Sequence, residues 1–328
     1  MEQKYISSFG QVQRLLFDFE ATLKRHGISI EQGSDLGRIG LAVIDLFERG
    51  KAPQLQNPRE DLRRYVADIL GVRTFMTKVV SLRTHPDFVQ LLPHLRKLNS
   101  GRVPQNSPSG ILDQISPKIF ELLIALGAMQ IGSNLKLDHP DHSAGDNPDI
   151  LVTVDEVRYG LACKALLGSS SAALVQNLKK GIDQIERSAA DTGFVVVNVK
   201  DLIDHNSCWP TPADVDFGDG VEVDSVAWPD LRFVLSYLTA LATKRVLDME
   251  QSIGIPALQA MFHGKKAVPV VVHFLHTATA LAGPTGPVAT SVLFLHLYGY
   301  GATVVSRLNE ALQDLPPGED SQGPKASR

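Results

Sequence analysis

The stretch from Phe194 to Val199 (FVVVNV) constrains the fold more than any other segment of the chain. A strand this apolar has no face suited to water, so it belongs in the centre of a sheet that is covered on both sides. The segment before it, Ser171–Ala190, carries apolar residues at helical spacing and predicts one covering helix, with Gly193 ending it and Ala189 on its inner stripe. These segments together predict an α/β domain.

Residues 116–164 predict one helix and three strands. The helix, Ser116–Gly127, is apolar over most of its surface, and Ser116 followed by Pro117 is typical of a helix start in which the serine caps. A turn at Asp155-Glu156 should join the last two strands into an antiparallel hairpin. The predicted strands are Asn134–Leu137, Ile150–Val154 and Val157–Lys164.

The first hundred residues predict helices only, with apolar residues at helical spacing. A run of turn-forming residues at Val103–Gly110 then indicates a boundary. We therefore expect a helical domain over 1–103, an α/β domain over 104–314 and a disordered tail over 315–328. Later apolar runs predict further strands that either extend the sheet or form their own layer, near Val268–His276 and Val288–Leu297.

Composition points to a protein of the cytoplasm. The two cysteines offer neither a disulfide framework nor zinc spacing, and the N-terminus lacks the layout of a signal peptide. The segment Ala267–Ser306 contains no Asp, Glu, Lys or Arg, but a Gly- and Pro-rich turn divides it into halves too short to cross a bilayer. We expect no membrane partner.

Charge is unevenly distributed along the chain. Residues 1–110 hold 16 Lys and Arg against 11 Asp and Glu, a balance of +5, and since the whole chain sums to −4 the remainder carries −9. The basic residues near one predicted helix favour contact with phosphates, although a solvated helix face is the simpler explanation at this modest charge. They are Arg59, Arg63, Arg64, Arg73 and Lys78.

Three charged residues follow one another along the chain on successive predicted elements. Glu121 lies on a helix, Asp149 follows a proline at the start of a strand, and Lys164 ends the next strand. In this order and on these elements, the residues resemble the PD-(D/E)xK superfamily, the restriction-endonuclease-like nucleases. The resemblance covers residues 111–203, less than a third of the chain. It implies a mixed sheet flanked by helices, and Mg²⁺-dependent or Mn²⁺-dependent hydrolysis of nucleic acid, with DNA the expected substrate, in a defence or repair setting.

The resemblance also implies a role for each residue. Asp149 would be the central metal ligand, Glu121 would bind the ion directly or through water, and the Cys163 carbonyl would be a main-chain ligand. Lys164 would orient or deprotonate the attacking water and offset charge in the transition state. Gln184 on the following helix, with Lys180 one turn earlier, would hold Lys164 or a substrate phosphate, or Gln184 is simply a polar residue beside a core stripe.

Ala162 departs from the family pattern, which has a second carboxylate at this position. Three explanations are open. The acid has moved to Glu121 or to the Asp183/Glu186 region, the alanine is an engineered inactivation, or the protein binds without cutting. The alternative functions are accordingly a non-catalytic nuclease-fold module that binds nucleic acid or assembles a larger complex, and a scaffold or homo-oligomer without a nucleic-acid role.

Two histidine pairs are weaker candidates for function. His139 and His142 lie in an acidic loop that resembles a metal site only in composition. His273 and His276 lie in an apolar run, which favours core histidines with satisfied hydrogen bonds.

Overall fold

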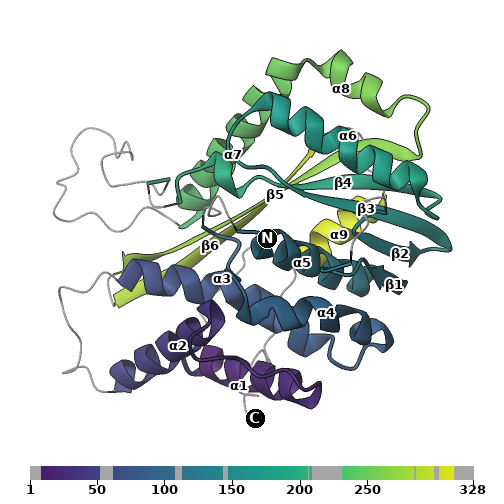
Figure 1. Ribbon diagram of the computed structural model, residues 1–328. Helices are drawn as coiled ribbons and strands as arrows, with labels where there is room; N and C mark the ends of the chain where they lie inside the picture. The colour runs from purple at the N-terminus through teal and green to yellow at the C-terminus, as the bar shows by residue number, and fades with distance from the viewer. Residues whose placement is uncertain are drawn as a thin grey trace, which may run out of the picture.

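The computed structural model describes residues 9–51, 62–107, 113–142, 147–205, 207–208, 231–283, 286–298 and 303–313. Within them, a mixed sheet lies between two layers of helices (Figure 1), so the predicted α/β class is confirmed. The helices are α1 (Phe9–Arg25), α2 (Asp35–Lys51), α3 (Leu62–Ser81), α4 (Leu92–Leu95), α5 (Ile115–Ile131), α6 (Ser171–Arg187), α7 (Leu231–Ile253), α8 (Ile255–Phe262) and α9 (Thr303–Gln313).

Among the described residues, the sheet has six strands in the order β1-β2-β3-β4-β5-β6. β2 runs antiparallel to both of its neighbours, β1 and β3. β3, β4 and β5 run parallel, and β6 returns antiparallel to β5. The late apolar runs therefore extend the sheet and form no separate layer. The strands are β1 (Ser133–Leu137), β2 (Ile150–Val154), β3 (Val157–Ala165), β4 (Thr192–Asn198), β5 (Ala267–Gly283) and β6 (Gly286–Tyr298).

The β2–β3 hairpin turns at the predicted position. Asp155 and Glu156 have φ values of 48° and 68°, and Val154 pairs with Val157. Two consecutive residues of positive φ form the type of two-residue turn whose twist matches the flanking strands. This turn sets the register that brings the start of β2 beside the end of β3.

Strand β4 is covered on both faces, as its sequence predicts. Phe194 and Val196 belong to a core cluster shared with α1, α3, α5 and α9, whereas Val195 and Val197 belong to a second cluster shared with α6, α7 and α8. Figure 1 shows the same two layers, with α6, α7 and α8 on one side of the sheet and α3 and α5 on the other.

The N-terminal helices share the first of these clusters with the sheet. Lys78 of α3 is fully buried and donates a hydrogen bond to the carbonyl oxygen of Ala311, in the last turn of α9. This burial corrects the expectation that Lys78 contacts phosphates. The boundary at residue 103 stays a prediction, and the tail over 315–328 lies outside the described residues.

Three predictions about α6 were wrong. Helix α6 ends at Arg187, Ala189 is exposed, and Gly193 lies inside β4, where an added Cβ would lie 2.1 Å from the carbonyl oxygen of Gly160. The close approach of two strands, rather than a helix end, requires this glycine. Near the end of the N-terminal region, which the sequence predicts to be helical, α4 is short and lies between two 3₁₀ helices, Pro86–Leu91 and Arg96–Asn99.

None of the helices in the described part of the chain is both long and apolar enough to cross a membrane.

Candidate active site

Asp149 meets Lys164 where β2 begins and β3 ends. The backbone N–H of Cys163 donates to Asp149 Oδ2 at 2.6 Å, and Lys164 Nζ donates to the same oxygen at 3.2 Å. The ammonium group also donates to the carbonyl oxygen of Cys163 at 2.9 Å. The antiparallel register, in which Ile150 pairs with Leu161, therefore brings the predicted aspartate and lysine into direct contact.

Glu121 projects from α5 and is bonded to two residues that were not predicted from the sequence. Lys118 Nζ lies 2.8 Å and 3.0 Å from the two carboxylate oxygens, and His94 Nε2 lies 3.2 Å from Oε2. Lys118 stands three residues before Glu121, a spacing that pairs side chains on a helix, and this was the available signal. His94 comes from α4, and nothing in its local sequence indicates a site.

The two lysine side chains are more exposed than the two carboxylates with which they pair. The side chains of Asp149 and Glu121 are 8% and 6% exposed, against 13% for Lys164 and 22% for Lys118.

Burial and charge shift the protonation equilibria of the site. Burial raises the pKa of Asp149 to about 6, the Lys164 charge opposes this rise, and the negative charge of Glu121 adds to it. For Lys118, burial lowers the pKa, but Glu121 outweighs it through its charge and hydrogen bond, so the net pKa is raised. The charge of Glu121 therefore affects the protonation of Asp149, although Glu121 lies on α5 and Asp149 lies just before β2.

Burial raises the pKa of the Cys163 thiol well above its usual value, and the neighbouring Asp149 adds to the rise. The thiol is therefore protonated near neutral pH. Its backbone, rather than its sulfur, takes part in the site.

Ala162 is buried in the apolar layer between β3 and α6. Its exposure is 0%, and its Cβ would lie 3.2 Å from a Cβ added at Gly181 of α6. A carboxylate at this position would lie in the apolar cluster of Leu174, Leu178 and Ile182. In this fold the alanine is a packing residue beneath the helix.

Two locations were proposed for a displaced acid. Glu121 acts electrostatically on Asp149, whereas in the Asp183/Glu186 region Asp183 is exposed on α6 and Glu186 binds elsewhere. The Glu186 side chain accepts a hydrogen bond from the backbone N–H of Ala267, where β5 begins and pairs with Gly193 at the start of β4. Lys164 pairs instead with Val197, near the other end of β4. Glu186 therefore lies near the opposite end of these parallel strands from Lys164.

For the other predicted site residues, the structure gives the position in the chain and, for two of them, the exposure of the side chain. Gln184 is half-buried on α6, and Lys180 is exposed on the same helix. The role predicted for Gln184 remains a prediction, since the hydrogen bonds of Lys164 described above go to Asp149 and Cys163. Arg59 lies outside the described residues, and Arg63 and Arg64 lie in the first turn of α3 with side chains outside the described part.

A buried polar network fixes the first turn of α5. Lys200 Nζ donates to Ser116 Oγ at 2.7 Å, Gln105 Nε2 donates to the same oxygen at 3.3 Å, and Asn198 Nδ2 donates to Gln105 Oε1 at 2.9 Å. Burial lowers the pKa of Lys200 to about 8. Since the network ties α5 to the end of β4, it sets the position of the turn that carries Lys118.

Ser116 was predicted to cap this helix, but it does not. The helix begins one residue earlier, at Ile115, and the Asp113 carboxylate accepts the backbone N–H groups of Ile115 and Ser116 at 3.0 Å and 2.9 Å. The serine hydroxyl instead accepts a hydrogen bond from the Lys200 ammonium group.

A metal ion would compete with groups that already occupy the carboxylates. Both oxygens of Glu121 and one oxygen of Asp149 are bonded to lysine ammonium groups, as is the Cys163 carbonyl. Among the described residues, no group of three or more His, Cys, Asp or Glu side chains is arranged to hold an ion. The donors are of the kind that Mg²⁺ prefers, but as arranged they do not form a site for it.

The weaker histidine candidates have contacts of their own. His139 and His142 stack on each other with ring centroids 4.6 Å apart. His273 and His276 are buried, as predicted, and His273 Nδ1 lies 3.7 Å from a carboxylate oxygen of Glu250, on α7. Burial raises the pKa of Glu250 to about 7.

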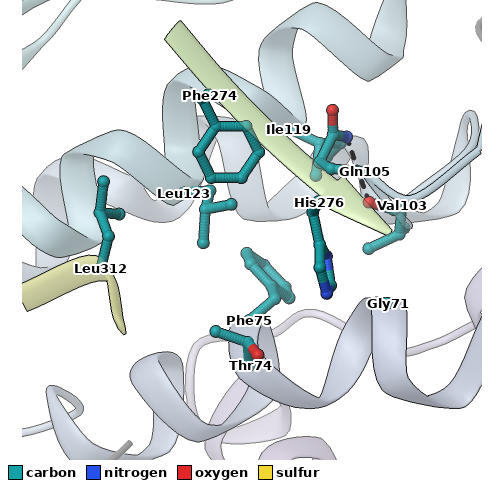
Figure 2. A pocket seen from close by; sticks show the side chains of 10 residues that line it. All are labelled: Gly71, Thr74, Phe75, Val103, Gln105, Ile119, Leu123, Phe274, His276 and Leu312. Carbon is teal, nitrogen blue, oxygen red and sulfur yellow. Dashed lines mark hydrogen bonds between the residues drawn. The ribbon is translucent and has the colours of Figure 1, made fainter. Parts of the chain in front are cut away.

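A small cavity of about 10 Å³ lies between α3, α5 and β5, where it holds at most about one water molecule. Figure 2 shows His276 and the Phe75 ring beside it, with Gln105 donating to the Val103 carbonyl nearby. Burial lowers the pKa of His276 to about 4, so the ring is neutral there. The cavity is too small for a substrate.

No protein-family model matches the chain, and no curated protein or solved structure gives a significant match. The interpretation of the site therefore depends on its geometry and chemistry.

Proposed function

We propose that this protein hydrolyses phosphodiester bonds of nucleic acid, with DNA as the expected substrate, at the site formed by Glu121, Asp149 and Lys164. The observation that carries the proposal is the contact of Lys164 Nζ with Asp149 Oδ2 at 3.2 Å, between residues that the PD-(D/E)xK pattern pairs. The helix before β1, the β2–β3 hairpin and the buried strand after α6 give further support. A defence or repair setting and homo-oligomerisation belong to the same proposal.

The residues of the site suit charge stabilisation and proton transfer. Lys164 and Lys118, the more exposed members, would bind the scissile phosphate and offset the negative charge that develops on its oxygens. Asp149, whose pKa is about 6, is deprotonated near neutral pH and would accept a proton from the attacking water. Glu121 would supply the second carboxylate that position 162 does not provide.

Magnesium, when bound, would polarise the phosphate and activate water, and Glu121, Asp149 and the Cys163 carbonyl are the donors available to hold it. Since these donors are bonded to lysines, we assign no catalytic step to the ion.

The proposal is tested by incubating the purified full-length protein with plasmid and single-stranded DNA in the presence of Mg²⁺ or Mn²⁺. We expect cleavage by the wild type, and rates lower by about 100-fold or more for Asp149→Asn and Lys164→Met, because each change removes a group that acts in the transition state. Glu20→Gln, which alters an exposed carboxylate on α1, is the matched control and should cleave like the wild type. Cleavage that persists in both site variants would refute the proposal.

The second candidate is a module that binds nucleic acid without cutting it. It is favoured by the burial of Ala162 and by the pairing of each carboxylate with a lysine. In the same experiment, the absence of cleavage by the wild type, combined with retention of labelled DNA in a gel-shift assay, would support this function instead. Loss of the shift in Lys164→Met would locate the binding at this site.

A further inference from the structure

Two stacked histidines have no part in the function proposed above. The rings of His139 and His142 have their centroids 4.6 Å apart, and their planes lie 23° from parallel. Both side chains are exposed, on the segment that follows β1. Aromatic pairs gain most of their stability from burial, whereas this pair leaves flat ring surface open to solvent.

Hydrogen bonds hold this segment in one conformation. His139 Nδ1 accepts a bond from the backbone N–H of Asp141 at 3.2 Å, and the backbone N–H of His142 donates to the His139 carbonyl oxygen at 3.3 Å. Lys97 Nζ donates to the Asp141 carboxylate at 2.6 Å, and its positive charge offsets a negative charge that would repel a phosphate. The stack is therefore formed before any ligand arrives, which lowers the entropic cost of binding.

The stacked pair lies close to the candidate active site. The backbone N–H of Asp138 donates to the carbonyl oxygen of Asp149 at 2.9 Å, which continues the pairing of β1 with β2 by one residue. Since Asp138 directly precedes His139, the Cα atoms of His139 and Asp149 lie within about 10 Å of each other. A strand of nucleic acid with a phosphate at Asp149 therefore has a neighbouring nucleotide within reach of the histidines.

We propose that His139 and His142 form a stacking platform for an unpaired nucleobase of the substrate, next to the phosphate that the candidate active site takes. This inference rests on the proposed function, because it names the form of nucleic acid that the same site accepts. Every base has a flat π surface, so stacking on aromatic side chains binds single strands with little dependence on sequence. A base inside a duplex is already stacked on its neighbours, and the platform therefore selects single-stranded segments.

The test measures binding of the full-length protein to a short single-stranded oligothymidylate that carries one 2-aminopurine, with EDTA present so that the DNA stays intact. The fluorescence of this base falls when it stacks, so the wild type should quench it. His142→Ala should weaken binding by about fivefold or more and reduce the quenching, because a ring is removed from the platform. His142→Phe, which keeps a flat ring without ring nitrogens, should restore both quantities.

Two controls separate stacking from general attraction to DNA. His263→Ala, which removes an exposed histidine after α8, should bind and quench like the wild type. An oligonucleotide with abasic positions keeps the phosphates but offers no base to stack. The wild type should bind it about fivefold or more weakly than the intact strand, and His142→Ala should weaken its binding no further.

Equal affinity and quenching in the wild type and in folded His142→Ala would overturn the inference, and so would an absence of binding to the intact strand. A loss of affinity in His142→Ala that His142→Phe does not restore would also overturn it, because the contact would then need a ring nitrogen. If the wild type cleaves DNA in the earlier assay, these results refute the platform and keep the hydrolytic function. Quenching that depends on the ring at position 142, without cleavage by the wild type, would keep the platform and refute hydrolysis.

Discussion

At the scale of single residues, the fold holds the Asp149 carboxyl group where its charged form is energetically disfavoured. Asp149 is buried, and its negative form is disfavoured by burial and by the charge of Glu121. Such perturbed groups concentrate at functional sites, because chemistry near neutral pH needs acids whose pKa lies close to it. The raised pKa of such a group should be measurable as a dependence of the unfolding free energy on pH.

We predict that Asp149 makes the protein less stable as the pH rises. The pKa of this carboxyl is raised from 3.8 to about 6 in the folded state. The folded protein therefore holds the proton more tightly than the unfolded chain does. The stabilisation from this proton is complete below pH 3.8, falls as the pH rises and is lost above about 6.

Asp149→Asn should remove this dependence. The unfolding free energy of the variant, minus that of the wild type, should rise by about 2–3 kcal/mol between pH 4 and pH 7, as measured by urea denaturation. Glu20→Gln on α1 provides the matched control, with a flat difference expected. A flat difference for Asp149→Asn as well would contradict the raised pKa.

At the scale of elements, the contact between β3 and α6 explains why position 162 is small. Gly181 brings the helix close to the strand, and an added Cβ there would lie 2.9 Å from a methyl carbon of Val195. Moving the helix away from the strand would break the apolar contacts of the cluster that contains Leu178. A carboxylate at position 162 would therefore be buried among these apolar side chains.

We therefore predict that Ala162→Glu destabilises the protein and does not create activity. Burial of a larger, charged side chain under α6 should lower the unfolding free energy by about 3 kcal/mol or more, measured by urea denaturation. Ala172→Glu, at a residue exposed on α6, is the control and should change stability by less than about 0.5 kcal/mol. A stable Ala162→Glu variant that cleaves DNA faster than the wild type would show that the alanine is a lesion in the site.

The element scale also shows what the sequence could predict. Period and turn chemistry identified the β2–β3 hairpin and β4. The order of Asp149 and Lys164 along the chain predicted that these two residues meet, since strand register follows from a two-residue turn. His94 escaped prediction because its contact with Glu121 crosses 27 residues and depends on how α4 packs. The orientation of Ala162 toward α6 was equally invisible, since a single alanine carries no sign of the face it occupies.

At the scale of the whole molecule, a buried contact joins α3 to α9, two helices that are far apart in the chain. Lys78 donates to Ala311 across 233 residues, and its side chain is fully buried. A cation near the final carbonyls of a helix stabilises that helix through the alignment of its peptide dipoles. The contact joins the N-terminal helices to the last described helix.

Lys78→Met should loosen α9 selectively. We expect the unfolding free energy to fall by about 1–3 kcal/mol, because the last turn of α9 loses a buried donor. Hydrogen exchange of the α9 amides should accelerate more than that of β4. Lys24→Met, an exposed lysine on α1, should change neither quantity, and unaltered exchange in α9 of the Lys78 variant would show that the contact contributes little.

The spatial order of the strands, which equals their order along the chain, has a consequence for biosynthesis. Each strand that leaves the ribosome finds its pairing partner already made at the edge of the growing sheet, and no later segment must be inserted between two earlier ones. Nascent chains can therefore assemble from β1 outward as translation proceeds. Asp149 and Lys164 would meet in the first three strands, well before the sheet that supports them is complete.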